Sequence, residues 1–286
     1  MLYFELFVQG LVQGSIYALI AVGLTLVYGL LRILHVAHAG LFTLGGYIGV
    51  IVTNSTNSVL LALVCAVVIV GVCGVLIYRF CYQPILHRPP YVALIASIGL
   101  FIAMEETFRI VFGPYGLSYA NPPLYGRLTL FGMSFKEAEI WTFVGALTLM
   151  SVLAVLSGRT RTGVAWRATV TDPQMAESFG VDIIRVRYLN FFIGSALAGI
   201  AGVMVALLNN LVEPTMGSVA SYKALAIIVL GGLGDVRGAL AAAMLLGVIE
   251  AFGTIYLDDL MDRDAIAFAF LIIVLMFRPH GLLGKA

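Results

Sequence analysis

Long apolar stretches follow one another along nearly the whole sequence, and they constrain the fold more than any other feature. A helix needs about 20 apolar residues to cross about 30 Å of hydrocarbon, and only helices or closed barrels satisfy their backbone there. The stretches are continuous and do not alternate in polarity, so helices are favoured over a barrel. The predicted spans are 6–31, 37–53, 58–80, 91–112, 139–157, 188–209, 216–231, 238–257 and 264–277. We therefore predict an all-α polytopic transmembrane helical bundle of about nine spans, or eight if 37–53 or 216–231 is a partial, re-entrant helix.

Composition limits the class of protein further. Hydrophobic residues make up 61% of the chain and charged residues 11%, whereas a soluble domain is typically about 45–50% apolar and about 25% charged. So few charges cannot cover a core with a polar surface, which excludes a soluble enzyme and a disordered or fibrous protein. We predict one membrane domain over residues 1–286. The net charge of +1 argues against a nucleic-acid partner, which requires a dense basic face.

The basic residues predict the orientation in the membrane. In a nine-span arrangement with the C-terminus inside, eleven of the 16 Lys and Arg residues fall on one side. The richer side is normally cytoplasmic, so the C-terminus is expected in the cytoplasm and the N-terminus outside; eight spans would place the N-terminus inside. The five basic residues on the other side are Arg109, Arg127, Lys136, Lys223 and Arg263.

Residues 158–187 form the longest polar segment of the chain. Asp172 followed by Pro173 is typical of an N-cap with proline at the first helical position, and Gly180 suits a C-cap. The pattern predicts a two-turn helix over 173–179 on the cytoplasmic face. An ordinary basic loop and a docking element for a partner protein both fit the segment. Small residues, which allow a partner to approach closely, occur at Gly163, Ala165, Ala168 and Ala176.

A family resemblance begins in this segment. It resembles the cytoplasmic ATPase-docking loop of permeases in branched-chain amino-acid-type ABC importers through Thr162–Ala168, Asp172, Ala176, Gly180 and Val181. The similarity covers essentially the whole chain, and the order and spacing of the motifs make it specific. The resemblance continues through Phe192–Val203. The shorter of the two permease types in such importers is favoured by Gly14–Gly23, Val27–Gly29, Gly231–Gly234, Gly238–Ala239 and Arg278–Gly284.

The resemblance implies a permease subunit of an importer for branched-chain or other small amino acids in a bacterial-type inner membrane. It also implies two partner ATPases, a second and different permease, and an extracytoplasmic solute-binding protein. The chain has no ATP site of its own, so ATP and Mg²⁺ are expected in the ATPases, and we expect no enzymatic activity, cofactor or metal site here. The residues assigned to ATPase coupling are Arg167, Ala168, Asp172, Pro173, Ala176, Glu177 and Gly180.

Two breaks in the apolar pattern are candidates for a substrate pathway. The glycine-rich run 231–238 superficially resembles a phosphate loop, but it follows a membrane helix and no Gly-Lys-Ser/Thr motif occurs, so nucleotide binding is not expected. Interrupted helices in transporters expose backbone dipoles that can bind solutes. Together with Leu44–Gly46, the run Leu230–Gly232 fits a degenerate internal repeat.

The second break lies at 32–40. Family members typically show Asn-Phe-Ala-His-Gly here, and His38 matches the histidine, whereas His35 stands at the asparagine position and Ala39 replaces the glycine. Three residues apart, the two histidines share a helix face. They fit a packed pair, a polar lining of the pathway or, with ligands that the nearby sequence does not supply, a metal site.

Charges inside apolar stretches are costly and are functional candidates by default. Glu250 is the most isolated acid, and a structural and a pathway role both fit it. Lys223 is expected to extend outward, and Glu105 and Arg109 to form a pair on one helix. The complete set assigned to the substrate pathway is His35, His38, Gly45, Gly46, Tyr47, Gly231, Gly232, Gly234 and Glu250.

The alternative function is an ion-gradient-driven secondary transporter or channel for a small solute. Such a protein needs paired ionisable groups at the membrane midplane, and Glu250 and the two histidines are the only candidates. A membrane enzyme would need a clustered catalytic set, and no such set has credible spacing. Dependence on ATP rather than on a proton or sodium gradient separates the two transport hypotheses.

Overall fold

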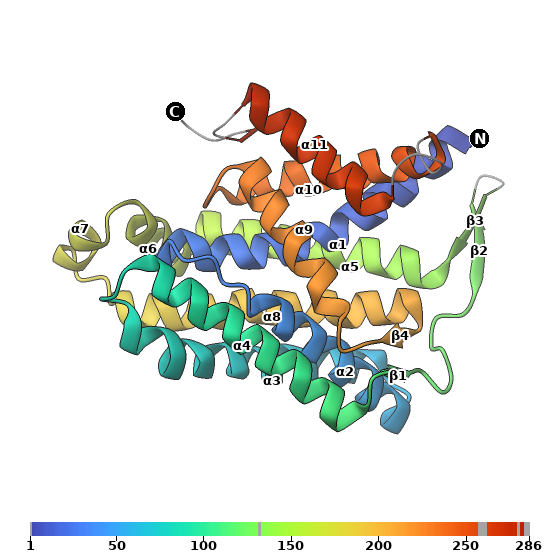
Figure 1. Cartoon of the computed structure of the whole chain (residues 1–286), viewed down its shortest axis with the longest axis horizontal. Helices are drawn as coiled ribbons and strands as arrows, with labels where there is room; N and C mark the ends of the chain where they lie inside the picture. Colours follow the sequence, from blue (N-terminus) through green and yellow to red (C-terminus); the bar gives the residue numbers. More distant parts are fainter. Residues whose placement is uncertain (1, 131–132, 257–261, 279–280, 283–286) are drawn as a thin grey trace.

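The computed structural model describes residues 2–130, 133–256, 262–278 and 281–282, and its described part is mainly helical (Figure 1). The helices are α1 (Leu2–Leu31), α2 (His38–Thr56), α3 (Val59–Ile77), α4 (Pro90–Phe112), α5 (Glu137–Arg159), α6 (Arg161–Thr171), α7 (Pro173–Ser178), α8 (Ile183–Asn209), α9 (Met216–Gly231), α10 (Val236–Tyr256) and α11 (Arg263–Phe277). A π-helical turn (Tyr78–Tyr82) and a 3-10 turn (Gln83–Ile85) follow α3. Short strands are β1 (Leu117–Ser118), which pairs with β4 (Leu211–Val212), and β2 (Arg127–Leu130), which pairs with β3 (Met133–Lys136).

Each of the nine predicted apolar stretches contains a helix. The stretch 216–231 coincides with α9, whereas α8 begins at Ile183, five residues before the predicted 188. Within the described residues, six helices are long and apolar enough to cross a membrane: α1, α3, α4, α5, α8 and α10. The prediction of eight or nine spans is therefore confirmed only as an all-α chain with at least six such helices. The predicted spans that are not among these six helices correspond to α2, α9 and α11, which are shorter or more polar than the six.

The long helices lie side by side along the longest axis of the molecule, with α7 at one end and the β2–β3 hairpin at the other (Figure 1). The two central helices α1 and α8 are largely buried, whereas most of α4 and α5 is exposed. The exposed side chains on α4 and α5 are predominantly apolar. This distribution places an apolar surface around a packed centre, as a lipid environment requires.

The helices around α1 and α8 form two related halves that run in opposite directions. Immediately after each long helix comes a residue with φ of 54°, Arg32 after α1 and Asn210 after α8. Each is followed by five residues and then by a short helix that starts at His38 or Met216. The packing also corresponds: α1 contacts α9 and α10, and α8 contacts α2 and α3. The arrangement is an inverted repeat of α1–α3 and α8–α10, of a kind common in transporters.

The repeat has a different register from the one predicted. Matching Arg32 to Asn210 and His38 to Met216 gives the same separation in both cases, and this separation aligns Gly45 with Lys223. The predicted pairing of Leu44–Gly46 with Leu230–Gly232 is therefore wrong. The similarity of the two Leu-Gly-Gly motifs is local, whereas the repeat is defined by helix ends and packing.

Glycines allow the repeat to pack tightly. A Cβ atom added to Gly202 in α8 would collide with the carbonyl oxygen of Phe42 in α2, and one added to Gly10 in α1 would lie 2.6 Å from the Cα of Val248 in α10. Such close backbone contact is typical of small residues between membrane helices.

Gly202→Ala is expected to destabilise the chain by about 1–3 kcal/mol, since α2 and α8 must separate to accept the methyl group. Gly99→Ala on α4 is the matched control, because nothing lies within 4 Å of its added Cβ and alanine raises helix propensity by about 1 kcal/mol. Thermal denaturation of the purified chain in detergent measures both. Equal shifts of Tm for the two variants would contradict the packing argument.

Candidate functional site

A network of four charged side chains and one tyrosine lies between α1, α9, α10 and α11. Glu250 is fully buried and accepts hydrogen bonds from the Tyr17 hydroxyl at 2.7 Å and from the Arg263 Nε at 2.8 Å. The Lys223 Nζ lies 3.0 Å from Glu250, 3.1 Å from Asp264 and 2.9 Å from the Tyr17 oxygen. Two cations and two carboxylates thus form one neutral cluster, which is what burial of charge requires.

This cluster corrects the prediction for Lys223 and supports the structural role that was one of two options for Glu250. Lys223 does not extend outward, because only 4% of it is exposed. Glu250 is isolated in sequence but has three partners in space. The missed signal was the presence of opposite charges in separate apolar stretches, since each needs a partner of opposite sign inside the membrane. The predicted pair of Glu105 and Arg109 is confirmed at 3.3 Å.

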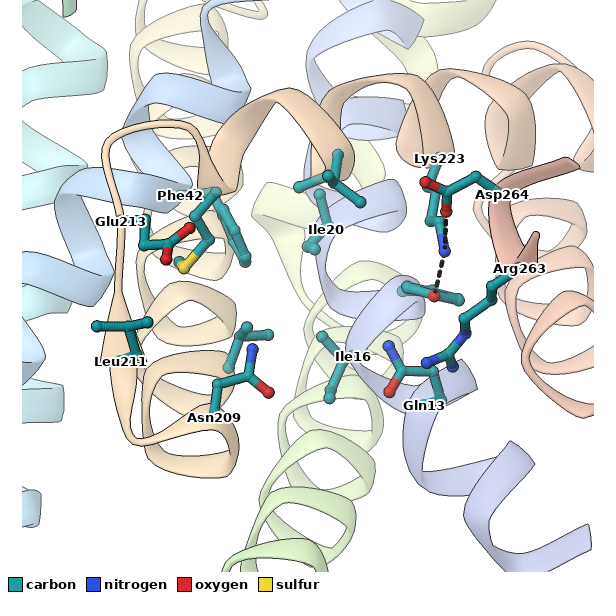
Figure 2. Close-up of a pocket in the computed structure, with 15 residues that line it drawn as sticks. Gln13, Ile16, Ile20, Phe42, Asn209, Leu211, Glu213, Lys223, Arg263 and Asp264 are labelled. Atoms are coloured by element: carbon teal, nitrogen blue, oxygen red, sulfur yellow. Dashed lines mark hydrogen bonds and ion pairs between the residues drawn. The ribbon is translucent and has the colours of Figure 1, made fainter. Parts of the chain in front are cut away.

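A cavity of about 500 Å³ opens beside the network (Figure 2). Its walls come from α1, α2, α8, α9, α11 and the segment around β4. Leu211 of β4 lines it, and Figure 1 shows β4 far from α6 and α7, toward the opposite end of the molecule. Apolar side chains make up much of its lining, including Ile16, Ile20, Phe42, Val205 and Val219.

The polar groups of the cavity lie at its two ends. Figure 2 shows Lys223, Arg263 and Asp264 at one end and Glu213 at the other, with Ile16 and other apolar side chains between them. Glu213 belongs to the segment that joins β4 to α9. In the described part of the chain its carboxylate has no hydrogen bond or ion pair. The cavity can therefore offer a solute both charges, separated by an apolar wall.

The two histidines lie deeper than the cavity. The His35 Nδ1 is 2.6 Å from the Tyr82 hydroxyl, and the His38 Nε2 is 3.2 Å from the Ile20 carbonyl oxygen. The rings approach edge to face with centroids 5.8 Å apart. Both histidines line a small void that shares Ile20 and Ala220 with the large cavity. They are packed side chains placed directly behind the cavity wall.

The remaining predicted pathway residues do not line the large cavity. Gly45 packs against Gly199 of α8, Gly46 against Val212 and Met216, and buried Tyr47 stacks on Phe112 with centroids 4.2 Å apart.

The three glycines after α9 form its C-terminal break. Gly231 packs against Gly238 and Ala239, while Gly232 and Gly234 have φ values of 105° and 88°. Of the nine predicted residues, Glu250 alone contacts the polar end of the cavity, through Lys223, Arg263 and Tyr17. A pathway role for the set stays a prediction. Sequence reasoning missed Glu213 and Arg263 as cavity residues.

The predicted short helix is present as α7 and is capped as expected. The Asp172 Oδ1 accepts a hydrogen bond from the Met175 backbone at 3.0 Å, Pro173 occupies the first position, and Gly180 follows the helix with φ of 83°. Among the other predicted residues, Ala168 accepts the Asp172 backbone N–H at 2.9 Å.

Two apolar side chains at α7 are exposed. Phe179 is 81% exposed and Met175 is 56% exposed. Ala176 is buried beneath them, Glu177 is exposed, and the Arg167 guanidinium donates to the Ser157 carbonyl oxygen. We call Met175 and Phe179 the α7 apolar pair. Sequence reasoning assigned neither residue to ATPase coupling.

Residues 6–277 match the family described as the permease component of branched-chain amino acid transport systems. The chain is 33% identical to the BraD permease protein of Pseudomonas aeruginosa, over 99% of this chain and 96% of the relative. It is 33% identical to LivH of Escherichia coli, over 97% and 94% of the two chains. It is also 26% identical to LivM of Escherichia coli, over 94% of this chain and 68% of that protein. The chain belongs to the family of branched-chain amino acid transport system permease components.

Proposed function

We propose that this protein is a permease subunit of an ATP-binding-cassette importer that moves branched-chain or other small amino acids into the cell. The observation that carries the proposal is similarity to permease proteins of high-affinity branched-chain amino acid transport over almost the full length of both chains. Two ATPases holding ATP and Mg²⁺, a second permease of the LivM kind and an extracytoplasmic solute-binding protein would complete the system. This chain would hold no cofactor.

The α7 apolar pair supports ATPase docking on the segment 158–187. Asp172 caps α7 by accepting the Met175 backbone N–H, and exposed Phe179 is the kind of aromatic anchor that enters a pocket of a partner. Because α6 packs on α5 and α8, a displacement of α7 by closing ATPases would reach the central helices.

The inverted repeat supports alternating access. The starts of α2 and α9 cross closely, with the position for a Cβ on Gly217 only 2.6 Å from the Ala39 carbonyl oxygen. This crossing lies behind the cavity, near Ile20 and Ala220. The described state would then be open on the β4 side and closed on the α7 side. Movement of one half against the other would open the opposite side.

We infer the orientation from the same arrangement. We place the arginine-rich α6–α7 segment in the cytoplasm. Then α1 and α11 run toward the cytoplasm. Both α2 and α9 would begin within the membrane, and α2 would run toward the outside and α9 toward the cytoplasm. The chain would then have nine membrane-embedded helices, an inner-membrane location and a cytoplasmic C-terminus.

ATP-driven uptake of L-leucine tests the proposal. The complete complex in proteoliposomes, supplied with loaded binding protein, is expected to accumulate labelled leucine with ATP and to lose that uptake when the ATPases cannot hydrolyse ATP. Dissipating the proton and sodium gradients serves as the control and is expected to leave uptake unchanged. Uptake that needs a gradient and persists without functional ATPases would overturn the importer proposal in favour of a secondary transporter.

A further inference from the structure

We propose that the end of the cavity between α9 and α11 recognises the zwitterionic backbone of a neutral α-amino acid, with Arg263 binding the carboxylate and Asp264 the ammonium group. This inference rests on the proposed import of small amino acids. It goes further by naming the groups within this chain that would contact such a solute.

The two side chains present opposite charges on the wall of the same cavity. The carboxylate and ammonium group of an α-amino acid are attached to the same carbon, so they match opposite charges that lie close together. Arg263 and Asp264 are consecutive, both line the cavity, and their side chains are 41% and 40% exposed. Glu213 is a poorer ammonium partner for the same solute, because it lies at the other end of the cavity beyond Ile16 (Figure 2).

The position of Arg263 leaves the two terminal nitrogens of its guanidinium group available to a solute. Its Nε bonds the buried carboxylate of Glu250 at 2.8 Å, and within the described residues its two terminal nitrogens have no hydrogen-bond partner. These nitrogens match a carboxylate in a bidentate geometry. Gln13 lines the same cavity and adds a polar side chain to its wall.

At this end of the cavity, away from Glu213, charge balance favours a zwitterion over an ion. Lys223 and Arg263 are already balanced by Glu250 and Asp264. A solute with a single charge would leave an unbalanced charge in a poorly solvated site, which is costly, whereas a zwitterion adds none. Asp264 already forms an ion pair with Lys223. A carboxylate offers about four acceptor positions, so Asp264 can also accept an ammonium group.

The rest of the cavity predicts the side chain of the solute. Its volume of about 500 Å³ lies within the range of about 300–1,000 Å³ for small-molecule sites. An aliphatic side chain extending from the charged end would contact Ile16, Ile20 and Phe42. A side-chain carboxylate would approach Glu213 and be repelled. The expected class is therefore neutral amino acids with apolar side chains.

Direct binding of labelled L-leucine to the complete complex in detergent, without binding protein, tests the inference. Arg263→Gln and Asp264→Asn are each expected to weaken binding about ten- to a hundredfold, the loss typical of a hydrogen bond to a charged group. Leucinamide lacks the carboxylate, 4-methylpentanoate lacks the ammonium group, and L-glutamate adds a side-chain carboxylate. All three are expected to compete far less well than unlabelled leucine.

Arg109→Gln and Glu106→Gln are matched controls, because these two residues form an ion pair at 2.9 Å on α4 and do not line the cavity. Both variants are expected to bind leucine like the unmodified complex.

ATP hydrolysis by each complex checks assembly. If Arg263→Gln does not assemble, the inference is tested with Arg263→Lys and Asp264→Asn. Arg263→Lys keeps the positive charge but loses the paired guanidinium nitrogens. A complex active in ATP-driven uptake that binds no leucine, or whose cavity variants keep its affinity and analogue ranking, overturns this inference alone. A complex without ATP-driven uptake overturns the proposed function instead.

Discussion

Glu250→Gln is expected to lower the free energy of unfolding by about 3–5 kcal/mol, the usual cost of breaking a buried ion pair by removing one partner. The substitution keeps the shape of the side chain, so no cavity is formed. It removes the charge that faces both Lys223 and Arg263 at 2.8–3.0 Å and leaves one positive charge in excess. Equilibrium denaturation in detergent measures the change.

The control is Glu106→Gln, whose side chain is half exposed and whose effect should stay within about 0.5 kcal/mol. The double variant Glu250→Leu with Lys223→Met gives a second check. It removes one charge of each sign and leaves Arg263 beside Asp264, so it is expected to be more stable than Glu250→Gln. A double variant no more stable than the single one would show that charge balance is not what Glu250 provides.

Phe179→Ala is expected to reduce ATP-driven uptake at least tenfold while the protein remains folded. The side chain is 81% exposed, so it contributes little to the stability of the chain. As an aromatic anchor at an interface, its truncation typically costs about 2 kcal/mol or more of binding energy. Uptake, and co-purification of the ATPases with the permease, measure the two consequences separately.

Phe80→Ala is the matched control, since Phe80 is 72% exposed and lies outside the segment 158–187. It should leave both uptake and co-purification unchanged. Asp172→Ala removes the cap of α7 and should give a smaller loss of uptake, in line with about 1 kcal/mol for an N-cap. Normal uptake by Phe179→Ala would contradict docking through the α7 apolar pair.

The helices were predictable from the sequence to an uneven degree. The stretch 216–231 matches α9, and the cap at Asp172 was found because caps and apolar runs are encoded locally. The number of spans was not predictable, because α2 is a helix that is not apolar enough over its length to count as a membrane crossing. A short helix that starts inside a membrane depends on neighbours that satisfy its ends. At the start of α2 the Ser97 hydroxyl of α4, 60 residues away, accepts a hydrogen bond from the Ala37 backbone N–H at 3.0 Å.

The candidate site was predictable only in part. Glu250 was identified because an acid in an apolar stretch stands out. Its partners lie 27 and 13 residues away in sequence, and no local pattern joins them. The glycines at Gly45 and Gly46 also stood out, but their role in the structure is close packing of α2, which produces the same sequence pattern as a flexible break.

By itself the sequence determined that this chain is a helical membrane protein, where its apolar helices lie, and that 158–187 carries a capped helix. Those properties depend on hydropathy and on contacts within a few residues. Only the tertiary structure decided that Lys223 pairs inward with Glu250, that Arg263 and Asp264 face a cavity, and that the two halves form an inverted repeat. These properties depend on which distant helices pack together, since a buried charge is stable only where another helix brings its counter-charge within hydrogen-bonding distance.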